Sequence, residues 1–170
     1  VIVADISSDG ILANEKILSD GWAALNNIVW SPDSKWLAYS QEDLYFNEEV
    51  FILAADSSFG PVNVSMHPRY DGSPFWSVDG TKLGFISSRN NRNNDVWFAW
   101  LNKEDWERTQ QDWEDKEPPV EEKSDKKDSK SDEKPKVKDI KIDLYKIHER
   151  LVQVTAFAGD ESGISISKDG

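Results

Sequence analysis

Short apolar runs separated by polar turn segments follow one another along most of the chain, a pattern that predicts closely spaced β-strands. The expected strands cover residues 1–6, 11–18, 28–30, 36–39, 50–53, 59–66, 74–76, 83–86, 95–101, 140–144 and 150–157. The runs 36–39 and 50–53 carry bulky residues at successive positions, so both of their faces should be buried. Strands of this kind lie between two neighbouring sheets.

The chain repeats itself with a constant offset. The segment WSPDSKWLAYS at residues 30–40 returns as WSVDGTKLGFI at residues 76–86, which is 46 residues later. The same offset pairs Val50 with Val96 and Phe51 with Trp97. A period of about 40 to 50 residues, with several short strands and a tight turn in each unit, is typical of β-propeller blades. We therefore predict an all-β fold, a partial β-propeller of about three blades, each a four-stranded antiparallel sheet.

The period also divides the chain into blades. Residues 1–25 should form the outer strands of a first blade, 26–68 a second blade, 69–158 a third blade and 159–170 the start of a fourth. A chain of 170 residues holds fewer units than most closed propellers need. We therefore expect it to be part of a longer protein.

The turn in each repeat contains an aspartate. Asp33, Asp79 and Asp169 stand at the same place in SPDS, SVDG and SKDG. An aspartate side chain at such a position hydrogen-bonds backbone N–H groups two residues on, which explains all three residues. A metal-binding or catalytic trio is the sharper alternative.

An insertion lengthens the third repeat. Asn102 can cap a helix over residues 103–113, which would place Trp106 and Trp113 on one face. Residues 114–139 contain 10 acidic and 8 basic side chains and almost nothing apolar. Such a segment cannot bury enough surface to order itself, so residues 102–139 are expected to be a helix followed by a disordered charged loop. A lysine-rich docking tail is the alternative for the loop.

Composition narrows the range of partners. The chain has 32 acidic and 20 basic residues, a formal charge of −12, which argues against nucleic acid and anionic membranes as partners. It has no cysteine, which excludes disulfides and thiolate zinc sites and leaves the compartment open. No apolar run is long enough to cross a bilayer, so we expect no membrane partner.

The search for catalytic or ligand-binding chemistry gives no site. His67 lies in MHPRY, as a loop or edge residue, and His148 lies in a turn; neither is near a G-x-S-x-G nucleophile motif. Arg89 and Arg92 could hold a carboxylate, although a solvated loop explains them as well. We assign no catalytic residue, no cofactor-binding residue, no cofactor and no metal ligand.

One succession of motifs resembles a known family. DVWFAWLNKEDWER (95–108), a charged insertion and KIDLYKIHERLVQVT (141–155) are similar to the propeller region of tricorn-like proteases. The resemblance implies a large serine peptidase in which two propellers, a PDZ-like domain and catalytic domains follow one another. It also implies that propellers form peptide channels and that subunits assemble into hexamers. This segment is more similar to the second propeller. No catalytic position of the family matches a residue here.

These observations together predict a noncatalytic propeller segment of a tricorn-like serine peptidase, which acts as a scaffold and as a channel for peptide access or product exit. The channel would run near Val29 and Phe75. The alternatives are a TolB-like or stand-alone propeller that binds proteins, and the propeller of a prolyl oligopeptidase-like enzyme. Peptide substrates and a homo-oligomer, a hexamer by resemblance, are the expected partners. The cytoplasm is the expected location, and the periplasm is the alternative.

Overall fold

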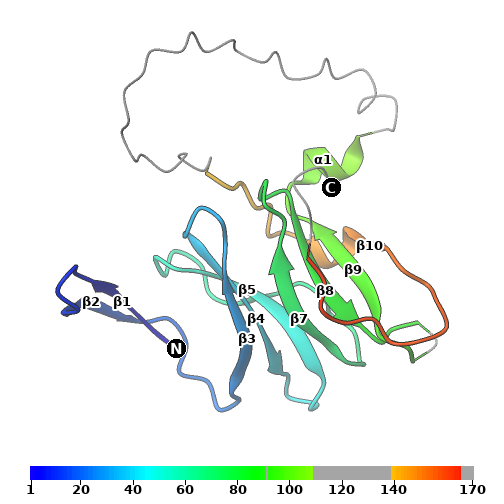
Figure 1. Cartoon of the computed structure of the whole chain (residues 1–170), viewed down its shortest axis with the longest axis horizontal. Helices are drawn as coiled ribbons and strands as arrows, with labels where there is room; N and C mark the ends of the chain where they lie inside the picture. Colours follow the sequence, from blue (N-terminus) through cyan, green and yellow to red (C-terminus); the bar gives the residue numbers. More distant parts are fainter. Residues whose placement is uncertain (91, 109–138, 166–170) are drawn as a thin grey trace, which may run out of the picture.

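A computed structural model describes residues 1–90, 92–108 and 139–165. Within them the chain has a partial, propeller-like all-β fold made of antiparallel sheets (Figure 1). The elements are β1 (Ile2–Ile6), β2 (Leu12–Ile17), β3 (Leu25–Trp30), β4 (Trp36–Glu42), β5 (Glu48–Ala54), β6 (Val62–Asn63), β7 (Asp71–Trp76), β8 (Lys82–Ser87), β9 (Asp95–Trp100), α1 (Lys103–Glu107), the 3₁₀ turn η1 (Ile147–Glu149) and β10 (Leu151–Gln153).

The strands form one hairpin and two four-stranded sheets. Strands β1 and β2 form the N-terminal hairpin, β3-β4-β5-β6 form the central sheet, and β7-β8-β9-β10 form the C-terminal sheet. The central sheet lies between the hairpin and the C-terminal sheet (Figure 1). Each sheet is therefore a meander of sequential strands, as in a propeller blade.

Both faces of the central sheet are buried, as predicted from the bulky residues of its middle strands. One face contributes Ala38, Val50 and Ile52 to a core that also contains Leu83 and Phe85 of the C-terminal sheet. The other face carries a second cluster of buried side chains, Leu37, Tyr39 and Leu53, with Val1, Val3 and Leu18 of the hairpin region packed against it. The sheets thus stack face to face.

The predicted 46-residue repeat holds at the level of strand register. Trp30 pairs with Leu37 in the central sheet, and Trp76 pairs with Leu83 in the C-terminal sheet. Both sheets also have a β-bulge at the same place in the innermost strand, between Asn26 and Val29 and between Gly72 and Phe75.

The bulge places Asn27 and Ser73 in the left-handed region, with φ of 51° and 52°. It explains why β3 and β7 begin earlier than the sequence pattern predicted: the bulge interrupts the alternation of side chains. It also accommodates Pro74 inside a strand.

The repeated turn aspartates stabilise their turns. The Asp33 Oδ1 atom accepts hydrogen bonds from Ser31 Oγ (2.6 Å) and from Lys35 N (3.1 Å). In the next repeat Asp79 Oδ1 accepts from Thr81 N at 3.0 Å. The turn interpretation is confirmed for these two residues, and Asp169 lies outside the described residues.

The prediction of a strand over residues 140–144 was wrong. This segment has no strand partner; its Ile140 N–H instead donates to Asp33 Oδ2 (2.8 Å) and its Asp143 N–H donates to Leu101 O (2.9 Å). The Ile140 side chain lies where a Cβ on Gly80 would be. The segment therefore bridges the turns of the two sheets, and its backbone donors are used there instead of in a ladder.

Other elements are shorter than predicted. Strand β6 covers Val62–Asn63 and β10 covers Leu151–Gln153. Helix α1 is capped by Asn102, whose side chain accepts from Glu104 N, as predicted, but it ends at Glu107 because Arg108 is extended. The rest of the predicted helix, up to Trp113, and all but the last residue of the predicted charged loop (114–139) lie outside the described part of the chain, as do residues 166–170 of the expected fourth blade.

Candidate functional site: an inner-strand cavity and a buried polar cluster

The innermost strands of the repeats line one cavity. It has a volume of about 480 Å³ and is bordered by β3, β7 and the segment 161–164. Ile28 and Pro74 stand 46 residues apart, at equivalent positions of the two sheets, and both line it. Ile164 lies on its wall 90 residues after Pro74, which is the longer spacing expected of the repeat with the insertion.

The backbone supports the equivalence of these three walls. Gly163 is left-handed with φ of 67°, like Asn27 and Ser73, which precede Ile28 and Pro74 directly. Val29 and Phe75, which were predicted to lie near a channel, are both on the cavity wall. The lining combines apolar side chains with Asn, Ser and Tyr side chains and the Glu161 carboxylate. Such a surface can contact an extended peptide without a deep apolar pocket that would retain it.

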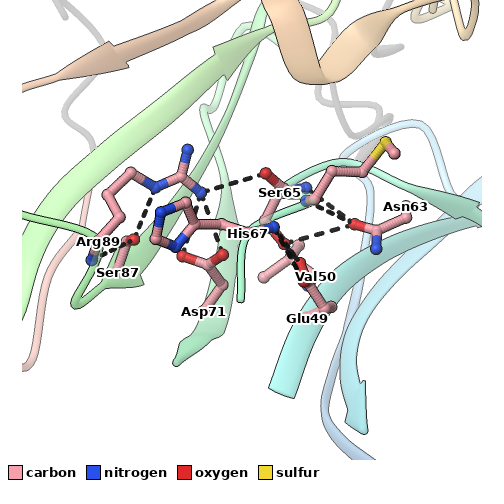
Figure 2. Close-up of polar contacts among 9 residues, drawn as sticks. Glu49, Val50, Asn63, Ser65, His67, Asp71, Ser87 and Arg89 are labelled. Carbon is pink, nitrogen blue, oxygen red and sulfur yellow. Dashed lines mark hydrogen bonds and ion pairs between the residues drawn. The ribbon is translucent and has the colours of Figure 1, made fainter. Parts of the chain in front are cut away.

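A second group of residues forms a buried polar cluster between the central and C-terminal sheets (Figure 2). Arg89 follows β8, and its Nη2 atom lies 3.1 Å from both carboxylate oxygens of Asp71 on β7. The same nitrogen donates to Ser65 O, just after β6, at 3.3 Å. The guanidinium also lies over the Trp97 ring, 4.8 Å from its centroid. Arg89 therefore joins the two sheets, and the solvated-loop interpretation was wrong for this residue.

The other half of the cluster surrounds Glu49 of β5. Ser65 Oγ donates to the Glu49 carboxylate, and the His67 N–H donates to its two oxygens at 2.9 and 3.1 Å. Burial raises the pKa of Glu49 to about 7, and the nearby Asp71 carboxylate adds to the rise, although the Ser65 hydrogen bond opposes it. Burial and the neighbouring Arg89 lower the pKa of His67. Near neutral pH the cluster holds a neutral imidazole and a carboxyl that is partly protonated.

The cluster has the residue types of a catalytic triad but not its geometry. Ser65 Oγ accepts a hydrogen bond from Val50 N (2.9 Å), and it donates to the Glu49 carboxylate and, at 3.4 Å, to Asn63 Oδ1. None of these partners is an imidazole. A nucleophile and its base must be within hydrogen-bond reach of each other. Ser65, Glu49 and Asp71 are also buried, and none of them lines the inner-strand cavity or the larger open cleft described below. The cluster stabilises the packing of the central sheet against the C-terminal sheet.

A larger open cleft lies between the N-terminal hairpin and the central sheet. Its volume is about 1150 Å³, and Trp30 and Trp36 are part of its lining. Trp76, the equivalent of Trp30, is covered by the central sheet and donates from Nε1 to Val29 O at 3.3 Å. Trp30 itself is 48% exposed. The cleft is therefore the place where the sheet-on-sheet contact of the repeats is incomplete.

Of the remaining candidates of the sequence analysis, His148 and Arg92 lie apart from these features, whereas His67 contacts the buried polar cluster through its backbone N–H. His67 is in the loop between β6 and β7, as predicted, and His148 is in the 3₁₀ turn η1. Arg92 is an exposed residue of the β8–β9 loop. The role of Glu49 was not predicted, although a carboxylate next to the apolar run 50–53 was a usable signal. The ion-pair partner of Arg89 depends on how the sheets stack, and this stacking cannot be predicted from a single sequence.

Among the described residues, no group of three or more histidine or carboxylate side chains could hold a metal ion. The helices of the described part are all too short or too polar to cross a membrane. A scan with protein-family models finds no matching family, and a search of curated proteins finds no match to this chain.

Proposed function

We propose that this chain is a noncatalytic β-propeller segment of a tricorn-like serine peptidase, and that it forms part of the wall of a peptide passage. The observation that supports the proposal most is the inner-strand cavity, in which Ile28, Pro74 and Ile164 occupy equivalent repeat positions. Strands stacked around an axis leave their first strands on the inside. The width of such a passage selects unfolded peptides by size.

The side chains that line the cavity would let a peptide pass through without binding it tightly. Its ionisable side chains are Tyr70 and Glu161, and the rest of the lining is apolar or carries neutral polar groups. In the proposed parent protein the peptide bond would be cut by other domains. The segment would then act as scaffold and sieve within a homo-oligomer.

A substitution that narrows the cavity tests this function in the full-length protein. Ile28→Trp adds a large side chain to the wall, and Val78→Trp is the matched control because Val78 is similarly exposed but lies in the turn after β7, away from the cavity. The products from short and long peptides are compared by mass spectrometry. We expect Ile28→Trp to shift the preference several-fold toward short peptides. An unchanged size preference, with both variants folded, would rule out the passage.

The coding sequence downstream separates the proposal from its alternatives. A PDZ-like region followed by a serine nucleophile supports the tricorn-like parent. A stop codon after a few more repeats supports a stand-alone protein-binding propeller. A G-x-S-x-G strand-turn-helix supports a prolyl oligopeptidase-like enzyme.

A further inference from the structure

The loop between β4 and β5 exposes a cluster of large apolar side chains. Leu44, Tyr45 and Phe46 are 78%, 82% and 73% exposed, and Trp22, in the crossing before β3, is 63% exposed. The rings of Trp22 and Phe46 meet edge to face with centroids 6.0 Å apart. We name these four residues the apolar tip. Clustered apolar exposure of this kind marks interaction sites, whereas single exposed apolar residues do not.

The apolar tip is held in a defined conformation. The Asp43 Oδ1 atom accepts from Tyr45 N (2.7 Å) and Asn47 N (2.9 Å), and Asp43 N donates to Asn47 O (2.8 Å). Phe46 is left-handed with φ of 62°, which costs a non-glycine residue about 1 kcal/mol. A loop fixed in this way loses little conformational entropy when a partner binds.

The neighbouring crossing is fixed as well. Gln41 Nε2 donates to Ala23 O at 3.0 Å, and Ala23 is buried. Trp22, directly before Ala23, is therefore held beside the loop. The four side chains form one surface contributed by two segments of the chain.

Folding does not require apolar residues in this loop. The 46-residue offset aligns Leu44, Tyr45 and Phe46 with Asn90, Asn91 and Arg92 of the β8–β9 loop. Phe46 and Arg92 have the same backbone conformation, with φ of 62° and 63°. The next repeat thus has a polar residue, Arg92, at the same left-handed position. The apolar side chains of residues 44–46 must therefore serve something other than the turn.

Charge indicates what kind of partner fits. Segments 19–24 and 41–49, which carry the apolar tip, contain no lysine or arginine. Four carboxylate residues outside the buried cluster flank the tip: Asp20, Glu42, Asp43 and Glu48. Anionic lipids would be repelled, and a second copy that docked through its own tip would bring like charges together.

We propose that the apolar tip docks into a partner protein that presents an apolar pocket bordered by lysine or arginine side chains. Its aromatic residues would be the anchors, because Trp and Tyr dominate binding energies at interfaces. This site is at the loops joining β4 to β5 and preceding β3, and its role does not depend on the peptide passage.

The test uses a displayed library of random peptides, selected on the full-length protein. A variant with the residues of the sister loop, Leu44→Asn/Tyr45→Asn/Phe46→Arg, serves for counter-selection. We expect enriched peptides that combine apolar residues with Lys or Arg. Their affinity, measured by fluorescence anisotropy, should fall about tenfold or more in the variant and should weaken as salt is added. The control Tyr145→Asn changes an equally exposed tyrosine elsewhere and should leave the affinity unchanged.

A single substitution keeps the test valid if the triple variant does not fold. Tyr45→Asn alone changes the most exposed side chain of the tip and should weaken binding several-fold. The proposal is overturned if no peptide prefers the native tip, or if the variants bind as well as the native protein. It is also overturned if the tip mediates binding to phosphatidylglycerol vesicles, or if it mediates a concentration-dependent dimer. Either result would identify a different class of partner.

Discussion

Asp33 in the first turn of the central sheet accepts a hydrogen bond from Ile140 N, 107 residues later, at 2.8 Å. Ile140 also packs against Gly80, in the equivalent turn of the C-terminal sheet. The chain that returns from the insertion is therefore attached to both repeats. Asp33 has a role beyond its own turn, and Asp79 provides the comparison.

The first prediction compares these two aspartates. Asp33→Ala should lower the free energy of unfolding more than Asp79→Ala does, by about 1 kcal/mol or more, because it also leaves the partly buried Ile140 N–H without a partner. Urea unfolding of both variants measures the difference. Equal losses would mean that the bond to Ile140 contributes nothing to stability.

The second prediction concerns complementary side-chain sizes in the two sheets. Val29 pairs with Ala38 in the central sheet, whereas the equivalent pair in the C-terminal sheet is Phe75 and Gly84. The Phe75 ring occupies the space that a Cβ on Gly84 would take. Gly84→Ala should therefore cost about 1 to 3 kcal/mol of stability.

The double variant Phe75→Val/Gly84→Ala reproduces the pair of the central sheet and should recover part of that loss. A double-mutant cycle in urea measures the coupling. Additive effects of the two substitutions would contradict the size complementarity.

The third prediction concerns the ion pair between the sheets. Arg89→Met should cost about 3 to 5 kcal/mol, because it leaves the fully buried Asp71 carboxylate without its cation. The double variant Arg89→Met/Asp71→Leu should cost clearly less than the sum of the two single variants, since it removes both charges. Urea unfolding of the three variants provides the test, and additivity would show that the pair is not coupled.

The fourth prediction concerns pH. Burial raises the pKa of Glu49 to about 7, so the folded state binds a proton more readily than the unfolded state. The stabilising effect of that proton is complete below the unfolded pKa and is lost as the pH rises toward 7 and above. Stability should therefore fall between about pH 5 and pH 8, by roughly 2 to 3 kcal/mol from this group.

Urea unfolding of Glu49→Gln across the same pH range isolates the contribution of this residue. The variant should show a flatter profile, because its side chain does not titrate. Burial also raises the pKa of Asp71, so the contribution of that group to the pH dependence has the same sign as that of Glu49. Parallel profiles of the variant and the native chain would exclude Glu49 as a source of the pH dependence.

The repeat was predictable because it depends on residues that lie close together in the sequence. The spacing of Trp30 and Trp76, each followed by a turn aspartate, indicates the 46-residue period. The successive apolar residues of β4 and β5 indicate that both faces of these strands are buried. The strand starts of β3 and β7 were missed because a bulge with a left-handed Asn27 or Ser73 breaks the alternation. Residues 140–144 alternate like a strand, yet their donors are taken by Asp33 and Leu101 O.

The candidate sites were less predictable. The pairing of Arg89 with Asp71 and the position of Glu49 beside Ser65 arise from the stacking of sheets, which depends on the whole fold. The apolar tip did leave a trace in the sequence, because Leu44, Tyr45 and Phe46 stand where the sister loop has Asn and Arg. Comparison of equivalent loops is therefore more informative here than the hydrophobicity of each loop alone.

Ser73 follows Asn27 by 46 residues, and Gly163 follows Ser73 by 90 residues. All three residues nevertheless have a left-handed backbone. The insertion leaves the C-terminal sheet after β9 and rejoins it before β10, and these are the two strands farthest from the innermost strand β7. Residues added between these outer strands therefore leave the left-handed backbone of the innermost strand unchanged.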